Sequence, residues 1–297
     1  MRKVMFIAFA LAAGLGARRA SATPFEPATV PDQVQAVGHL DVDALRKTQL
    51  FDALGGQAAI EAAIGDAPAD VQAVAKTLVR GARGVTFWRG AEHGAIYVET
   101  RDSHSLAQLL ARLPGKPGKP IDGFPTYALD EHGQTHFAAA YADTLVLADS
   151  DDSLAQSIHV LAGKAASLAG TTRLTLANRQ GLFVFVTIGD SLMNSIQKSA
   201  HSKMLQLAVK SVVVDGSEQG GNVVATAHAE MRTADAAQKA RSILDGLQAM
   251  ASLSDDAGLR MLLDGVSVTS NGMSVEVVAK VPVAEVAKLA REAHGRH

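Results

Sequence analysis

Residues 265–281 read GVSVTSNGMSVEVVAKV, and this stretch decides the class of fold. Its centre is Asn271-Gly272, a dipeptide preferred in the two-residue turn of a β-hairpin. We therefore predict antiparallel strands over 265–269 and 273–281. Apolar residues at helical spacing then follow from Val283 to about Ala293, so the chain is expected to close with a hairpin and a helix.

Upstream of this hairpin the sequence predicts the same mixture of hairpins and helices. Strands over 209–214 and 222–231 flank a Gly-rich turn at 217–221. Thr233 is expected to cap a long helix over 234–250, because its hydroxyl can accept from a free backbone N–H group. A further strand over 182–188 precedes Asp190, which we expect to cap the helix that follows.

The N-terminal half predicts more short strands and several helices. A first strand over 35–42 leads into a helix that opens at Asp43 as its cap, and Asp151 or Asp152 is expected to cap a later helix that runs to about Leu161. The segment from Lys116 to Lys119 is expected to be an irregular loop, because prolines and glycines interrupt it. The other predicted strands are 84–89, 95–101, 124–129, 136–141 and 144–148, and the other helices are 57–79, interrupted at 65–68, and 103–113.

The two halves match in the order of their elements, which predicts an ancient duplication. Asp43-Ala44-Leu45 and Asp190-Ser191-Leu192 each follow a first strand, and residues 99–102 and 230–233 each close a second hairpin and open a helix. Hairpins mixed with helices are typical of the α+β class. We predict two tandem, similar units of antiparallel sheet with helices packed on one face, over 35–168 and 169–297, after an extended lead-in over 23–34.

The first 22 residues have the three parts of a secretory signal peptide. Arg2 and Lys3 precede an apolar stretch, and the small residues Ala20-Ser21-Ala22 form a cleavage site before Thr23. The apolar stretch is shorter than the about 20 residues that span a bilayer. We expect cleavage after Ala22 and a soluble periplasmic or secreted product without a stable membrane anchor.

Charge and cysteine content narrow the function classes. The signal holds four of the 28 basic side chains and none of the 30 acidic ones, so the mature chain has a formal charge of −6. A mildly acidic chain without a basic stripe is unsuited to nucleic acid. The chain has no cysteine, which removes disulfides, thiolate metal sites and cysteine nucleophiles.

Four segments carry a resemblance to a family. They are residues 37–45 (VGHLDVDAL), 83–87 (RGVTF), 155–163, and 236–249 with its ending Gly246-Leu247-Gln248-Ala249. Together they resemble an uncharacterised family of exported bacterial proteins with a duplicated α+β unit. The resemblance implies a shared architecture, and because that family has no established activity it carries over no catalytic residues.

Gly189-Asp190-Ser191-Leu192 spells the nucleophile block of the GDSL hydrolases and follows a predicted strand, as that block does. A serine nucleophile needs a general base and an oxyanion hole. Only 105 residues follow Leu192, and they contain neither Asp-x-x-His nor Gly-x-Asn-Asp. We therefore keep a serine esterase centred on Ser191 as the alternative, and prefer a helix start at this position.

Three polar clusters are candidate ligand sites. His132 and His136 flank a turn beside Asp130, but the sequence fixes no third metal ligand. Asp149, Asp151 and Asp152 lack the Gly and the distant Glu of a calcium loop, and a helix N-terminus explains them better. His39 and Asp41 share one face of a strand, where they either line a pocket or pack within the sheet. We assign no catalytic, cofactor-binding or metal-binding residue.

The sequence therefore predicts a non-enzymatic exported protein that needs no cofactor. Its partner is expected to be a protein or a small apolar ligand, bound between a helix layer and a sheet.

Overall fold

A computed structural model gives the fold. It describes residues 24–64, 69–101, 106, 109–110, 115–131, 134–171, 174, 176, 182–195, 208–253, 260 and 263–294. The predicted signal peptide and His132 lie outside these residues. The chain forms two compact units: unit 1 comprises Met1–Lys47 and Gly55–Thr172, and unit 2 comprises Thr48–Leu54 and Arg173–His297.

Unit 1 is built on an antiparallel sheet with the strand order β1-β2-β3-β7-β6-β5-β4. The strands are β1 (Ala36–Asp41), β2 (Ala82–Arg89), β3 (Gly94–Thr100), β4 (Gly115–Pro117), β5 (Thr126–Glu131), β6 (Gln134–Tyr141) and β7 (Thr144–Ala148). The expected loop at Lys116–Lys119 is wrong in part, because Gly115–Pro117 pairs with Tyr127–Leu129 of β5. Proline is tolerated there because β4 is an edge strand.

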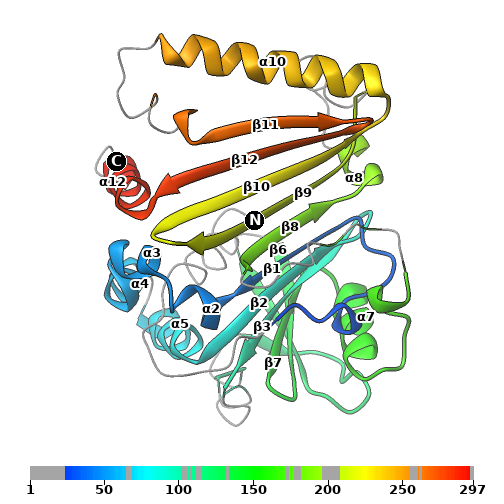
Figure 1. The fold of residues 1–297 in the computed structure, drawn as a ribbon. Helices are drawn as coiled ribbons and strands as arrows, with labels where there is room; N and C mark the ends of the chain where they lie inside the picture. Colours follow the sequence, from blue (N-terminus) through cyan, green and yellow to red (C-terminus); the bar gives the residue numbers. More distant parts are fainter. Residues whose placement is uncertain are drawn as a thin grey trace. The chain divides into compact units, whose positions relative to one another are not determined.

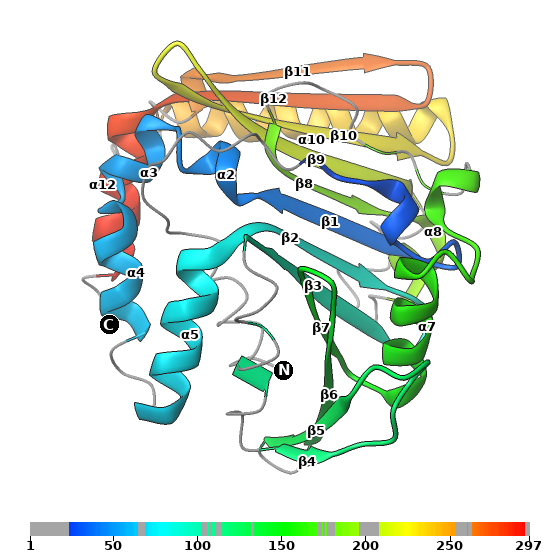
Figure 2. The same cartoon turned by 90° about the horizontal axis from the view of Figure 1, so that it is seen from below.

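The described helices of unit 1 follow the predicted stretches, and most of the predicted helix over 103–113 lies outside the described residues. They are α2 (Val42–Leu45), α4 (Gly56–Ile64), α5 (Ala69–Gly81) and α7 (Asp151–Leu161), with the 3-10 turns η1 (Pro27–Thr29) and η2 (Leu168–Gly170). Helix α7 packs against β3, β6 and β7, and Figure 2 shows it beside the ends of these strands. Leu154 and Ile158 of α7 are fully buried there, so this helix closes the core of unit 1.

Two predicted helix caps in unit 1 are wrong by one or two residues. The cap of α2 is Asp41, whose carboxylate accepts from Ala44 N at 2.8 Å, whereas Asp43 lies inside the helix. The cap of α7 is Ser150, whose hydroxyl accepts from Ser153 N at 3.1 Å. Asp151 and Asp152 occupy the first turn, where their negative charge favours the helix N-terminus.

Unit 2 has a five-stranded antiparallel sheet with the order β11-β12-β10-β9-β8 (Figure 1). The strands are β8 (Leu182–Ile188), β9 (Val209–Gln219), β10 (Asn222–Met231), β11 (Val266–Asn271) and β12 (Ser274–Pro282). The predicted hairpin turn is confirmed: Asn271 pairs with Ser274, and Gly272 has a positive φ of 58°. The predicted α+β class with antiparallel pairing is also confirmed in both units.

The helices of unit 2 are α3 (Gln49–Ala53), α8 (Asp190–Ser195), α10 (Ala234–Ser252) and α12 (Val283–His294). Thr233 caps α10 as predicted, because its hydroxyl accepts from Ala236 N at 3.1 Å. Asp190 is the first residue of α8 rather than the residue before it.

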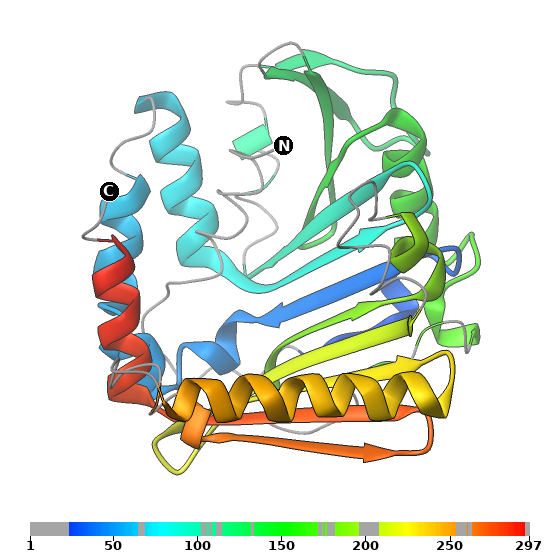
Figure 3. The same ribbon diagram turned by 90° about the horizontal axis from the view of Figure 1, so that it is seen from above.

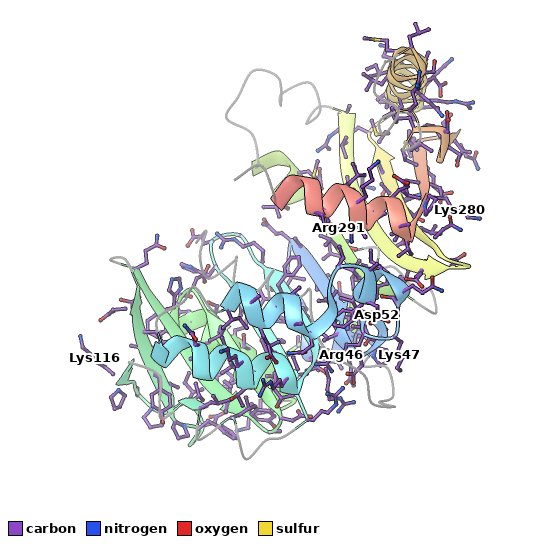
Figure 4. The ribbon with its side chains drawn as sticks, turned by 90° about the vertical axis from the view of Figure 1, so that its left-hand side faces the viewer. Arg46, Lys47, Asp52, Lys116, Lys280 and Arg291 are labelled. Carbon is purple, nitrogen blue, oxygen red and sulfur yellow. The ribbon has the colours of Figure 1, made fainter. Side chains whose placement is uncertain are left out.

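The short helix α3 is held to the rest of unit 2 at both of its ends. The Glu218 carboxylate accepts from the backbone N–H groups of Gln49 and Leu50 at 3.0 and 2.8 Å. At the other end, Arg291 of α12 donates to the Ala53 carbonyl at 3.4 Å. Figure 4 labels Arg291 and the neighbouring Asp52 on the two helices. An acidic side chain at the start of a helix satisfies its free N–H groups.

Candidate functional site: an apolar surface on unit 2

One face of the unit 2 sheet has a central row of apolar residues that runs from edge to edge. Val186, Val214, Ala227, Val277 and Val268 are directly opposite one another in β8, β9, β10, β12 and β11. Side chains in register across neighbouring strands lie on the same face of a sheet. These five residues therefore form a continuous row across all five strands.

The rows on either side continue this face. One contains Val184, Gly216, Ala225, Ala279 and Val266, and the other contains Ile188, Val212, Ala229, Val275 and Ser270. The opposite face is mixed: the row there contains Thr187, Val213, His228, Glu276 and Thr269. This mixed face is nevertheless covered near β8 and β9, where Thr187 and Val213 are 0% and 7% exposed.

Helix α10 covers part of this apolar face. Ala237 is buried in a cluster with Val209, Met231 and Val275, and Leu244 packs against that cluster. The helix contacts β11, β12 and β10, as Figure 3 shows from above. Val214 of β9 remains 42% exposed, so the part of the face farther from β11 is open to solvent.

The two flanks of α10 differ in character. Ile243 and Asp245 adjoin the core-facing Leu244 in sequence, and each is turned about 100° from it in opposite directions. Asp245 lines a polar pocket together with Ser270 and Gly272 at the β11 edge. Ile243 is therefore on the flank that faces β10 and β9.

That second flank carries large apolar side chains in contact with water. Ile243, Leu247 and Met250 are 57%, 55% and 70% exposed, at spacings of four and three residues along one side of the helix. Leu253, directly after α10, is 84% exposed. Helix flank and open sheet face thus meet in one apolar surface, which we call the α10 surface, made by Val186, Val214, Ala227, Ile243, Leu247 and Met250.

The charges of α10 neutralise one another. Lys239 is 2.7 Å from Asp235, and Arg241 is 3.5 Å from Asp245, each one helical turn apart. The helix therefore brings no excess of positive charge to the α10 surface. Helices that lie on anionic membranes, by contrast, carry many basic residues on their polar side.

The residues singled out in the sequence of unit 1 lie in its interior. His39 is buried, its Nδ1 is 2.9 Å from the Thr86 hydroxyl, and its ring is 5.8 Å from that of Phe25. Asp41 caps α2. The pair is thus part of the packing and capping of β1, which agrees with the structural interpretation of these residues.

Asp43 belongs to a buried charge network. Its carboxylate, 0% exposed, pairs with Arg46 at 2.8 Å, with Arg101, and with Arg83 at 3.8 Å. Burial and the nearby Arg101 lower the pKa of Arg46 to about 10. Arg46 also donates to the Val79 carbonyl at 3.2 Å, near the end of α5, so the network fastens α2 to α5. Among the described residues, Asp43 Oδ2 and Arg46 Nε have no hydrogen-bond partner.

A second carboxyl group of unit 1 is electrostatically unusual. Burial raises the pKa of Glu99 to about 7, and the negative charge of Asp143 adds to this effect. Arg83 acts in the opposite direction, while Glu26 and Asp41 raise the pKa further. Three carboxyl groups and one guanidinium thus face Glu99 within unit 1.

The structure gives no support to a metal site beside Asp130 or to a calcium site at Asp149. Asp130 pairs with Lys116 at 3.3 Å and accepts from Thr135 at 2.9 Å. Asp149 accepts from Gly94 N at 2.9 Å and pairs with Arg89 at 2.8 Å, so its oxygens serve the packing of unit 1. Within the ranges that the structure describes, no group of three or more His, Asp or Glu side chains is placed to hold a metal ion.

Ser191 is the second residue of α8, and its side chain is exposed. The preceding Asp190 forms an ion pair with Arg232. In the described part of the chain, Ser191 forms no hydrogen bond with a histidine. A serine nucleophile needs such a residue as its general base. Within the described residues, Ser191 therefore has no catalytic partner.

The α10 surface is the feature that the sequence prediction missed. A signal for it exists: α10 has apolar residues at 240 and 244, which face the core, and again at 243, 247 and 250. Two adjacent apolar stripes are more than one sheet face requires from one helix. The sequence alone does not show which stripe the sheet covers.

These features define an α+β protein with antiparallel sheets and an open apolar surface. The chain is similar in fold to solved structures of TP0453, a Treponema protein. Crystal form III matches with a TM-score of 0.54 and 11% identity over 90% of this chain and 97% of that chain. Forms IV and I match with TM-scores of 0.51 and 0.50, at 11% and 12% identity, over 92% of this chain and 98% of those chains.

No protein-family model and no curated protein matches the sequence. In the described part of the chain, the helices are too short or too polar to cross a membrane.

Proposed function

We propose that this chain is an exported, non-enzymatic binding protein that holds a partner protein on the α10 surface. The observation that carries the proposal is the flank of α10, where Ile243, Leu247 and Met250 are each more than half exposed. Clustered apolar side chains beside an open apolar sheet are typical of protein-binding surfaces. Met250 adds a flexible contact that adapts to the shape of a partner.

A partner protein fits the α10 surface better than a small apolar ligand does. Binding pockets for small ligands enclose about 70–90% of the ligand surface. The α10 surface is open, with Val214 and Leu247 42% and 55% exposed, so a small molecule would remain half in water. The apolar face of an amphipathic helix is long enough to cover both the sheet and the helix flank.

The charge of α10 favours a protein over a lipid surface. Its two basic residues, Lys239 and Arg241, are each balanced by an aspartate one turn away. We therefore infer a neutral, apolar contact region on the partner. The export part of the proposal rests on the signal-like segment before Thr23.

The test begins with affinity capture from periplasmic extract of the source cells, using the full chain and two variants. Leu247→Asp places a charge in the α10 surface, whereas Gln238→Asp places the same charge on the other flank of the same helix. We expect a captured protein to be lost with Leu247→Asp and retained with Gln238→Asp. Calorimetry with that purified protein should then show a negative heat-capacity change, which marks burial of apolar area.

Two outcomes contradict the proposal. Equal capture by both variants would place the contact elsewhere, and flotation of the chain with neutral lipid vesicles, lost in Leu247→Asp, would identify a lipid surface as the occupant. Export is checked separately by N-terminal sequencing of the secreted form, which should begin at Thr23. A start at Met1 would contradict export.

A further inference from the structure

The outer strand of unit 2 has a free edge. β11 is the last strand of the order β11-β12-β10-β9-β8, and no described strand pairs with its outer side. Figure 1 shows β11 at the edge of this sheet, with α10 running alongside. An edge strand presents a row of backbone groups that a further strand can bind.

The hydrogen-bond pattern identifies which groups point outward. Lys280 N donates to the Gly265 carbonyl at 2.8 Å, so this pair lies at a hydrogen-bonded position of the β11–β12 ladder. Hydrogen-bonded and non-bonded positions alternate along an antiparallel pair. The backbone groups of Val266, Val268 and Ser270 therefore point away from β12. The Val266 carbonyl confirms this, because it accepts from the Gln248 side chain at 2.9 Å.

The sequence of β11 lacks the features that usually protect an edge strand, and the contact of α10 with its backbone is a hydrogen bond from Gln248 to the Val266 carbonyl. Natural edges are shortened, bulged, or marked with lysine and proline. The edge strand of unit 1, β4, has three residues that include Lys116 and Pro117, and Lys116 extends into solvent in Figure 4. β11 instead has six residues, VSVTSN, in unbroken register with β12. Unlike β4, it is suited to pairing.

Charge on the neighbouring helix indicates what pairs with it. The polar flank of α10, with Arg241 and Asp245, lies over the β11 edge, where these residues line a pocket with Ser270 and Gly272. The hydrogen bond from the Gln248 side chain to the Val266 carbonyl shows that these two residues lie side by side on α10 and β11. A strand rises about 3.3 Å and a helix about 1.5 Å per residue, so Val268 is level with about residue 243 or 244 of α10.

A two-fold axis through Val268 therefore gives a charge-matched arrangement. It pairs β11 of two copies in antiparallel fashion, with Val268 opposite itself and Val266 opposite Ser270. Because residues 243 and 244 of α10 are level with the axis, the helices of the two copies run antiparallel with their polar flanks facing each other. Arg241 of each copy then lies beside Asp245 of the other copy, so the interface contains two equivalent pairs of opposite charge.

We infer that a second copy of this chain occupies the β11 edge, as a two-fold dimer with a continuous ten-stranded sheet formed from two copies of the five-stranded sheet of unit 2. The surface is self-complementary in backbone hydrogen bonds and in charge, as an isologous interface must be. The dimer leaves the α10 surface free, because Ile243 and Leu247 lie on the opposite flank. The inference is thus independent of the proposed partner.

The test is sedimentation equilibrium of the full chain and of charge-reversal variants. The wild-type chain should form a dimer. Arg241→Asp and Asp245→Arg should each weaken it at least about tenfold in Kd, because each places like charges together at two reciprocal positions. The double variant that exchanges the two charges should restore the dimer. Lys239→Asp is the matched control: it reverses a base in the same kind of intrahelical pair, outside the polar pocket, and should leave the dimer unchanged.

A second variant tests the strand pairing itself. Ser270→Pro removes an outward N–H group without breaking the ladder to β12, and it should dissociate the dimer while thermal unfolding stays cooperative. A wild-type chain that sediments as a monomer up to high concentration would overturn the inference. So would a dimer that survives both single charge reversals, or one lost in Leu247→Asp but kept in Ser270→Pro, since that dimer would use the α10 surface.

Discussion

The Asp43 carboxylate and the Arg46 guanidinium form an ion pair of 2.8 Å between side chains that are 0% and 4% exposed. In unit 2, Asp190 follows β8 as Asp43 follows β1, and it pairs with Arg232 just as Asp43 also pairs with Arg101. Asp43 is 0% exposed and Asp190 is 47% exposed, whereas Arg101 and Arg232 are similar at 38% and 32%. The two corresponding pairs thus differ chiefly in the burial of the aspartate.

This difference gives the first prediction. Asp43→Ala should lower the free energy of unfolding by about 3–5 kcal/mol, because it leaves the buried Arg46 charge uncompensated. Asp190→Ala should cost less than about 1 kcal/mol, as is usual for exposed ion pairs. Urea unfolding of both variants checks this, and equal losses at the two positions would contradict it.

Capping at Asp41 gives the second prediction. Asp41→Ala should lower the free energy of unfolding by about 1 kcal/mol, because the Ala44 N–H loses its acceptor. Asp41→Asn should lower the free energy of unfolding by only a few tenths of a kcal/mol, since Asn is as good a cap as Asp. Thermal melts of the two variants make the comparison, and a large loss in Asp41→Asn would show that the negative charge matters more than the cap.

The third prediction separates binding from hydrolysis at Ser191. Ser191→Ala should change the free energy of unfolding by no more than about 0.5 kcal/mol, because the side chain is exposed. It should also leave any cleavage of short-chain aryl esters unchanged. One melt and one assay with the purified chain suffice, and ester turnover that disappears in Ser191→Ala would favour the hydrolase.

The raised pKa of Glu99, about 7, gives a prediction on pH. Between the ordinary glutamate pKa and 7 the unfolded chain ionises while the folded chain keeps its proton, so the contribution of Glu99 to stability falls as pH rises through this window. Glu99→Gln should therefore raise the free energy of unfolding at pH 8 by roughly 1–3 kcal/mol, at about 1.4 kcal/mol per pKa unit. At pH 4 the two chains should be equally stable. A difference of the same size at both pH values would contradict ionisation as the cause.

We propose that the two units descend from a duplication. In support, β1-β2-β3-β7-β6 of unit 1 and β8-β9-β10-β12-β11 of unit 2 have the same order and the same antiparallel pairing. An experimental structure should superpose these strands one on another and bring Asp43 and Arg101 onto Asp190 and Arg232. If the aspartates fall on unlike positions of their strands, the similarity is one of topology alone.

The sequence by itself determined the elements and their class. Turn dipeptides such as Asn271-Gly272, alternation in the strands, and the cap at Thr233 act over a few residues, so local patterns reveal them. The same local logic misplaced the caps of α2 and α7, where Asp41 and Ser150 lie within one or two residues of the expected caps. Several neighbouring residues there have a side chain that can cap.

Only the tertiary structure decided which apolar stripe of α10 is covered and which is open. Leu244 and Ile243 are both apolar. Leu244 packs against the buried cluster that β9, β10, β12 and α10 form, whereas Ile243 is 57% exposed to solvent. The same holds for Asp43, which becomes a buried charge because β3 brings Arg101, 58 residues away, against it. Burial depends on contacts between distant parts of the chain, and for that reason the candidate site appeared only in the folded protein.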